Sequence, residues 1–146
     1  MPELRPIDPS VLGRYPSLKG RSVFVTGGGS GIGASIVKAF ALQGAKVAFI
    51  DIAEAPSRAL IADIAKAGAP APWFEPCDVR DIAAMQSAIA RAAAATGDFS
   101  VLVNNVALDD RHTLESVTPE YWERMIAINE RPALFAIQSV VPGMKR

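Results

Sequence analysis

The sequence predicts an α/β fold, a doubly wound parallel sheet truncated after the helix that follows its fourth strand. Four short apolar runs, each suited to a strand buried on both faces, alternate with segments whose apolar residues recur at helical spacing. A glycine cluster follows the first apolar run directly. The length of 146 residues suits one domain. These observations together favour strands and helices that alternate around a single sheet.

The order of the elements follows from the same patterns. Four prolines among the first 17 residues predict an extended arm, which leaves residues 18–146 as an incomplete domain. The predicted strands lie at residues 23–25, 47–50, 70–76 and 101–103. Helical spacing marks residues 32–41, 60–64 and 82–93, and a last helix that begins after Thr118 and runs toward Val141, interrupted near Asn129 and Pro132. Right-handed crossovers would wind these elements into a Rossmann-like sheet.

The composition argues against several classes of function. The 15 basic and 15 acidic residues give no net charge, whereas a nucleic-acid-binding protein usually has a basic surplus. The longest apolar run, residues 133–137, is far shorter than the ~20 residues of a membrane helix. One cysteine, Cys77, and one histidine, His112, make no metal cluster. We therefore expect a cytoplasmic protein whose partner is a small molecule, with no metal, membrane or nucleic acid.

The glycine cluster lies where a phosphate-binding loop would be expected. A tight turn needs residues that tolerate positive φ, and a pyrophosphate must approach bare backbone amides at a helix N-terminus. A glycine one turn into the helix also lets that helix pack close to the sheet. Without its neighbours the cluster could be a mere flexible turn, but strand, loop and helix follow one another here. The predicted cofactor-binding residues of this loop are Gly27, Gly29, Ser30, Gly31, Ile32 and Gly33.

An acidic residue, Asp51, closes the second predicted strand, 18 positions after Gly33. A carboxylate there can accept hydrogen bonds from an adenosine ribose and would repel the 2′-phosphate of NADP. Its expected neighbours, Ser30 and Ile52, offer that phosphate no positive charge. An ordinary solvated aspartate is the alternative interpretation. The pattern predicts NAD as the cofactor, with Asp51 and Ile52 in contact with it.

The glycine spacing is Gly-x-x-x-Gly-x-Gly, and Asp78-Val79 and Asn104-Asn105 follow the third and fourth predicted strands. With these motifs, residues 18–146 resemble the short-chain dehydrogenase/reductase family. The Tyr15 to Gly20 segment and the Asp109 to His112 segment look like those of its sugar-oxidising members. The resemblance implies an oxidoreductase that transfers a hydride from the anomeric carbon of a D-xylose-like aldose to NAD. It also implies a parent protein that is a homo-oligomer.

The resemblance assigns roles to single residues. It implies that Asp78 and Val79 hold the adenine and that Asn104 supports the sheet and the cofactor-side loop, next to Asn105 and Val106. The sequence reads Asn-Asn-Val-Ala at residues 104–107, where the family usually has Asn-Asn-Ala-Gly. Asn129 matches the catalytic asparagine whose backbone carbonyl positions a water, although it could simply mark a helix kink. The charged residues Asp109, Asp110 and Arg111 are candidates for binding sugar hydroxyls, and a merely solvated loop is the alternative.

The family's serine and its Tyr-x-x-x-Lys motif do not occur after the fourth predicted strand. The tyrosine takes the alcohol proton, and the lysine lowers its pKa. Tyr121 is followed four positions later by Met125, while Tyr15 and Lys19 precede the first strand. We therefore predict that the chain alone is inactive. The alternatives are a non-catalytic nucleotide-binding module and, less suited to the glycine spacing, a methyltransferase.

Overall fold

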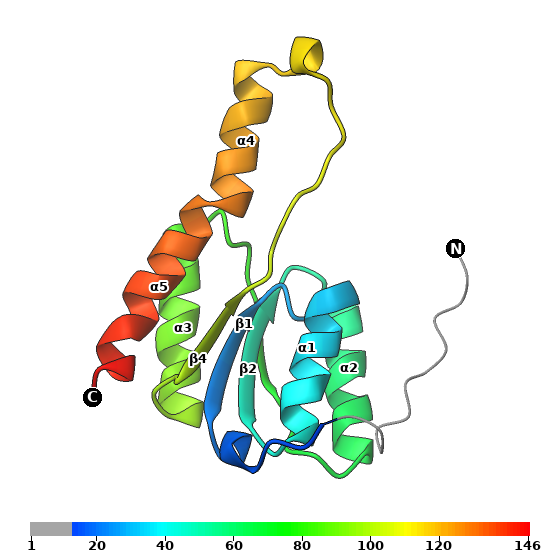
Figure 1. The fold of residues 1–146 in the computed structure, drawn as a ribbon, viewed down its shortest axis with the longest axis vertical. Coiled ribbons are helices and arrows are strands. Elements are labelled where there is room, and N and C mark those ends of the chain that lie inside the picture. The colour runs from blue at the N-terminus through cyan, green and yellow to red at the C-terminus, as the bar shows by residue number, and fades with distance from the viewer. Residues whose placement is uncertain (1–12) are drawn as a thin grey trace.

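The computed structural model describes residues 13–146, which form one parallel sheet with helices on both faces (Figure 1). The strands are β1 (Ser22–Thr26), β2 (Lys46–Asp51), β3 (Trp73–Pro76) and β4 (Val101–Asn104). The helices are α1 (Gly31–Leu42), α2 (Glu54–Lys66), α3 (Ile82–Thr96), α4 (Pro119–Asn129) and α5 (Arg131–Met144). The predicted α/β fold is confirmed, with each boundary shifted by a few residues at most, except that α2 begins six residues earlier than its apolar pattern.

The sheet has the strand order β3-β2-β1-β4, with every neighbouring pair parallel. The chain thus builds outward from β1 to β3 and then crosses back over the sheet, through α3, to the other side of β1. The order reverses between β1 and β4, and in open α/β sheets ligands bind outside the carboxyl ends of the strands at such a point. Thr26 pairs with Ile50 on one side and with Asn104 on the other, so β1 and β4 end at one level and β2 continues one residue further, to Asp51.

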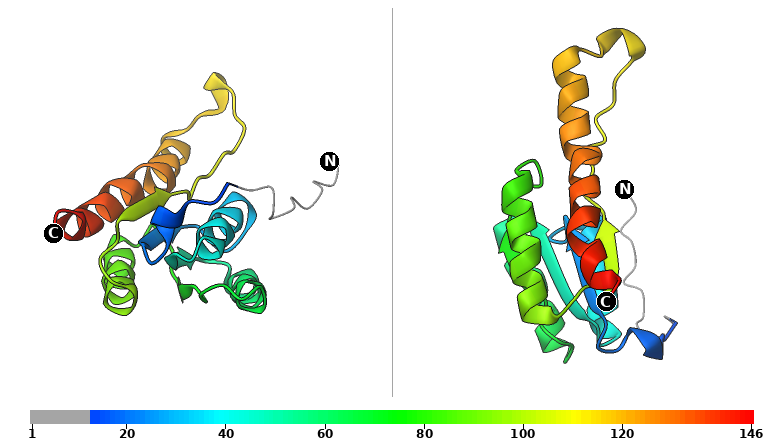
Figure 2. Two further views of the ribbon diagram at one scale, coloured as in Figure 1. Left: turned by 60° about the horizontal axis from the view of Figure 1, so that its bottom comes forward. Right: turned by 90° about the vertical axis from the view of Figure 1, so that its left-hand side faces the viewer.

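Alternation along the strands builds one core on each face of the sheet. Val23 and Val25 point to the face that α1 and α2 cover, where they pack in a cluster with Val37 and Ile64. Phe24 points to the opposite face, which α3 and α5 cover. Figures 1 and 2 show these two helical layers on either side of the strands. Burial on both faces explains why the strands read as continuous apolar runs.

The last helical segment breaks where the sequence predicted. Helix α4 ends at Asn129, Glu130 lies between the helices, and α5 begins at Arg131 with Pro132 in its first turn. The two helices lie nearly in line, and α4 extends beyond the carboxyl ends of the strands (Figure 2). On α5, Val140 is buried whereas Leu134 is 63% exposed. The break allows α5 to pack on the sheet face while α4 stands over the sheet's edge.

The predicted N-terminal arm needs one correction. Residues 1–12 of it lie outside the described residues. Residues 16 and 17, expected to be extended, open a 3-10 helix over Pro16–Leu18 instead. Proline fits the first position of such a helix because that position needs no amide donor. The backbone just before this turn is tied to α1 by the Gln43 side chain, which accepts from the Tyr15 amide at 2.9 Å and donates to the Gly13 carbonyl at 2.8 Å.

Candidate nucleotide-binding site

The glycine loop turns sharply from β1 into α1, and Gly27 and Gly33 are among its glycines that a larger residue could replace only with strain. Gly27 has a φ of +68°, a conformation that side chains strain. At Gly33 a Cβ would overlap the carbonyl oxygen of Gly27 and lie 2.7 Å from Asn105 Nδ2. The first turn of α1 therefore rests directly on the loop backbone.

The side chain that supports this loop is Asn105. Its Nδ2 donates to the carbonyls of Gly27 at 2.9 Å and Thr26 at 3.2 Å, and its backbone amide donates to Thr26 Oγ1 at 3.0 Å. Asn104 was expected to support both sheet and loop. It does pair with Thr26 within the sheet, but Asn104 is exposed, and the side-chain hydrogen bonds to the loop come from its neighbour. The loop-supporting role therefore belongs to Asn105, because successive side chains at a strand end point to opposite sides.

Asp51, at the end of β2, presents a fixed carboxylate beside the glycine loop. Its Oδ2 accepts from the Gly29 amide at 2.8 Å, and its Oδ1 accepts from the Ala53 amide at 2.8 Å. Gly29 was predicted to contact the cofactor, but its N–H is used here to orient Asp51. A carboxylate offers about four acceptor positions, so two of them stay free for a ligand.

A pocket of about 770 Å³ opens at the carboxyl ends of the strands. This volume lies within the ~300–1,000 Å³ typical of ligand sites. Of the predicted cofactor residues, Gly29, Gly31 and Asn104 do not line the pocket. Gly31 instead shapes the turn, with a φ of +53°. The predicted residues that do line it are Gly27, Ser30, Ile32, Gly33, Asp51, Ile52, Asp78, Val79, Asn105 and Val106.

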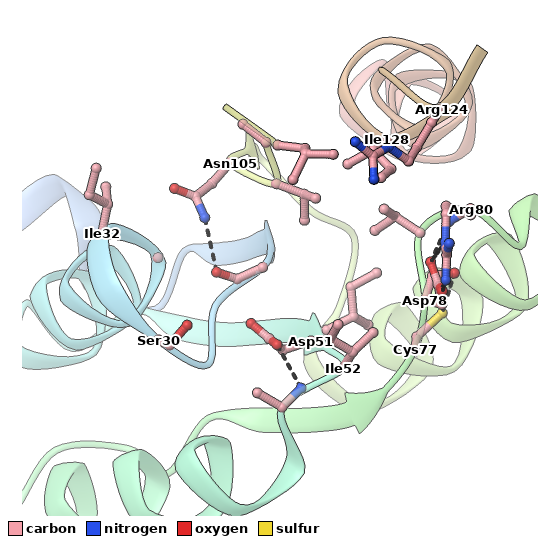
Figure 3. Close-up of a pocket in the computed structure, with 18 residues that line it drawn as sticks. Ser30, Ile32, Asp51, Ile52, Cys77, Asp78, Arg80, Asn105, Arg124 and Ile128 are labelled. Atoms are coloured by element: carbon pink, nitrogen blue, oxygen red, sulfur yellow. Dashed lines mark hydrogen bonds and ion pairs between the residues drawn. The ribbon is translucent and has the colours of Figure 1, made fainter. Parts of the chain in front are cut away.

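The far side of the pocket carries charges that are already paired. Arg80 donates from its side chain to both oxygens of Asp78, at 2.5 Å for the shortest contact, and this lowers the pKa of the Asp78 carboxyl. Figure 3 shows this pair on the opposite side of the pocket from Ser30. Burial, followed by the nearby acidic groups, raises the pKa of the Cys77 thiol. The Cys77 side chain lies at the pocket wall.

Helix α4 contributes two pocket residues that the sequence did not single out. Arg124 and Ile128 lie four positions apart on α4 and both point toward the pocket (Figure 3). Arg124 is held by Asp110, whose Oδ2 accepts from it at 2.6 Å. Their i,i+4 spacing indicates that the two side chains share one face of α4. The sequence does not show that this face is turned toward the pocket, because the direction of α4 depends on the break at Glu130.

Asn129 ties α4 to the segment that follows β4. Its Oδ1 accepts from the Leu108 amide at 2.7 Å, and its Nδ2 donates to the Leu108 carbonyl at 3.0 Å. The side chain is therefore committed to Leu108. It does not line the pocket, while its neighbour Ile128 does.

The candidate substrate residues Asp109, Asp110 and Arg111 lie on an exposed segment and do not line the pocket. The segment is fastened to α4 by polar contacts. The Tyr121 hydroxyl donates to the Asp110 carbonyl at 3.1 Å and lies 2.8 Å from His112 Nδ1. Asp110 is linked to the pocket through its ion pair with Arg124, which does line it.

Residues 13–146 offer neither a candidate metal centre nor a candidate membrane span. Within that range, no group of three or more His, Cys, Asp or Glu side chains is arranged to hold a metal ion. None of the helices in this range is both long enough and apolar enough to cross a membrane.

Sequence and structure comparisons place these features among known proteins. The chain is 49% identical, over 90% of its length, to a D-xylose 1-dehydrogenase of Caulobacter vibrioides. It is 48% identical, over 91% of its length, to a probable galactose dehydrogenase of Rhizobium meliloti. The matched regions are 51% and 52% of those proteins, so the chain spans about half the length of these curated relatives.

Two solved structures share the fold. A short-chain dehydrogenase/reductase of Serratia marcescens is 34% identical, with a TM-score of 0.83 over 89% of this chain and 53% of that one. A blue fluorescent protein from a metagenomic library, solved in complex with NADPH, is 35% identical, with a TM-score of 0.78 over 87% of this chain and 52% of that one. Residues 21–146 match the family model described as short chain dehydrogenase, which excludes the methyltransferase interpretation. The chain therefore belongs to the short-chain dehydrogenase/reductase family.

Proposed function

We propose that the pocket binds NAD and that the chain is the cofactor-binding part of a dehydrogenase that oxidises an aldose at its anomeric carbon. The loop geometry supports a dinucleotide. Gly33 leaves no room for a Cβ, so the N-terminus of α1 lies close to the strand ends, where its free amides can meet a pyrophosphate. The pocket extends from this loop past Asp51 to Asp78 and Val79, the residues expected to hold the adenine.

The observation that carries the choice of NAD is the fixed carboxylate of Asp51. Two backbone amides hold it in place, so its free acceptor positions have a defined direction toward the pocket. These positions suit the hydroxyls of a ribose, and the charge would repel a 2′-phosphate. The cations that line the pocket, Arg80 and Arg124, are each engaged by a carboxylate already. Since one solved structure of similar fold is a complex with NADPH, the choice between NAD and NADP is tested by titration.

The chemistry divides between the cofactor and the chain. When bound, NAD supplies the acceptor for a hydride. The residues of this chain bind and orient it: the α1 N-terminus at the pyrophosphate, Asp51 at the adenosine ribose, and Val106 beside the loop. Asn129 positions the segment after β4 through Leu108. In this proposal, its backbone carbonyl is left free to position a water.

The test of NAD preference is a titration of the chain with NAD and with NADP. We expect NAD to bind more tightly than NADP. The Asp51→Ala change should narrow this difference in affinity, because it removes both the acceptor for the ribose hydroxyls and the charge that repels the 2′-phosphate. Asp63→Ala is a matched control, since Asp63 is an exposed carboxylate on α2 that pairs with Lys66 and does not line the pocket. NADP binding equal to or tighter than NAD in the unmodified chain would refute the assignment.

The aldose is proposed from the names of the relatives, a D-xylose 1-dehydrogenase and a probable galactose dehydrogenase. Residues 105–146 contain no Tyr-x-x-x-Lys motif that could take the hydroxyl proton. General acid–base catalysis is typically worth about 10²–10⁴ in rate, so we expect no measurable turnover from the 146 residues alone. The assay compares them with the full-length protein that contains them, on aldoses and on steroids. Turnover of steroids but not of aldoses would refute the substrate class, and no turnover of either would favour the non-catalytic nucleotide-binding module.

A further inference from the structure

A serine of α2, Ser57, lies directly beneath the glycine loop. Its side chain is fully buried. Its Oγ donates to the Ala53 carbonyl at 2.7 Å, one turn earlier. Ala53 is also the residue whose amide donates to Asp51 Oδ1. Ser57 is thus connected to the Asp51 carboxylate through one residue.

The same hydroxyl contacts the other side of the Asp51 site. A Cβ on Gly29 would overlap Ser57 Oγ and would lie 3.0 Å from Asp51 Oδ2. The backbone of Gly29 therefore rests on the Ser57 hydroxyl, and from this position its amide reaches Asp51 Oδ2 at 2.8 Å. Both amides that hold the carboxylate belong to residues that contact Ser57.

We propose that Ser57 is a positioning residue for cofactor selectivity, which it exerts by fixing the two amides that hold the Asp51 carboxylate. This inference rests on the proposed function, because it assumes that Asp51 faces the adenosine ribose. Asp51 can exclude a 2′-phosphate only while it cannot rotate away from it. A smaller residue at position 57 leaves a gap beneath Gly29, and the carboxylate then gains the freedom to turn aside.

The test measures the dissociation constants of NAD and NADP for the Ser57→Ala variant. We expect the ratio of the NADP constant to the NAD constant to fall by about 3- to 10-fold, the worth of roughly one hydrogen bond. A general loss of stability would weaken both cofactors alike and leave the ratio unchanged. The variant is expected to fold, because the Ala53 carbonyl still accepts from the backbone amide of residue 57, which lies 3.2 Å away.

Ser139→Ala is the matched control. Ser139 Oγ donates to the Phe135 carbonyl at 2.8 Å, so it makes the same kind of contact one turn back along a helix. It lies on α5 and does not line the pocket. We expect this change to leave the selectivity ratio as it is in the unmodified chain.

A second measurement tests the contact itself. Gly29→Ala should weaken NAD binding strongly in the unmodified chain, because the new methyl group overlaps the Ser57 hydroxyl. In the Ser57→Ala background the same change should reduce NAD affinity by less, because the Ser57 hydroxyl is absent and the new methyl group meets only the neighbouring Asp51. A cost of equal size in both backgrounds would show that the two residues do not act together.

The outcomes separate the inference from the function on which it rests. If Asp51→Ala changes the ratio while Ser57→Ala behaves like Ser139→Ala, the positioning role is overturned and the NAD assignment stands. If Asp51→Ala leaves the ratio unchanged, the proposed role of the carboxylate fails, and the role of Ser57 fails with it. A fall of the ratio in both variants supports the inference.

Discussion

Replacing Gly33 by alanine would force a methyl group into the turn between β1 and α1. The new Cβ would lie 2.7 Å from Asn105 Nδ2 and 2.8 Å from the carbonyl carbon of Gly27, and closer still to the Gly27 oxygen. Carbon contacts are comfortable at about 3.5–4.0 Å, so the turn must move by more than about 1 Å to relieve the overlap with the Gly27 oxygen. The neighbour is backbone and cannot yield as a flexible side chain would. The movement also displaces the carbonyl to which Asn105 donates at 2.9 Å.

The expected loss of stability in Gly33→Ala follows from three effects. Overpacking costs about 1–3 kcal/mol, and a weakened hydrogen bond about 1 kcal/mol. The higher helix propensity of alanine offsets about 1 kcal/mol. The net loss in the free energy of unfolding is therefore about 1–3 kcal/mol, and for a chain of this size the melting temperature should fall by about 3–10 °C. We also expect the affinity for NAD to fall, because the loop that moves is the one proposed to bind the pyrophosphate.

Thermal unfolding and NAD titration check this expectation. Lys38→Ala is a suitable control, since Lys38 is exposed on the same helix five residues later and its replacement should change stability by no more than about 0.5 kcal/mol. A Gly33→Ala variant with the same melting temperature and the same NAD affinity as the unmodified chain would refute the steric argument.

Two further predictions concern the pocket's surroundings. Asn129→Ala leaves the amide and carbonyl of Leu108 unpaired, so stability measured in urea should fall by about 1–3 kcal/mol; an unchanged midpoint would contradict this. Because Arg80 lowers the pKa of Asp78, their pairing stabilises the fold above the ordinary pKa, and the effect is lost as the pH falls through the lowered value. In Arg80→Gln, an NMR titration should show the Asp78 pKa returning toward its ordinary value, and an unmoved titration would show that another group lowers it.

The sequence predicted the elements of the site better than the contacts within it. The glycine loop and Asp51 follow apolar runs directly, and the carboxyl ends of parallel strands meet at one edge, so their proximity could be foreseen. The hydrogen-bond partners of Asp51 could not be foreseen. They are the backbone amides of Gly29 and Ala53, and a residue's type does not show what its backbone amide will bind. Ser57 was missed for a related reason, since a serine in a helix usually reads as an exposed position.

The confusion between Asn104 and Asn105 has a simple physical origin. Adjacent residues at a strand end face opposite sides, and a shift of one residue in register exchanges their roles. The sequence alone does not fix that register. Residues 109–111 were predicted to bind substrate because they follow β4. They do not line the pocket, because the direction of their segment is set by its contacts with α4. Thr26 could have been found, because a hydroxyl that ends an apolar strand needs a partner.

The bonds from Asn105 to the glycine loop have a consequence for the order of folding. They join residues 78 and 79 positions apart, whereas the β1–β2 pairs are 24 apart. Closing the longer segment costs about 1 kcal/mol more in chain entropy. We therefore expect β1, α1 and β2 to associate early and the loop to acquire its final shape only when β4 docks. Stopped-flow folding of Asn105→Ala should then show faster unfolding with little change in the folding rate. Nucleotide affinity would thus be a property of the finished sheet, although its most recognisable motif lies within the first 33 residues.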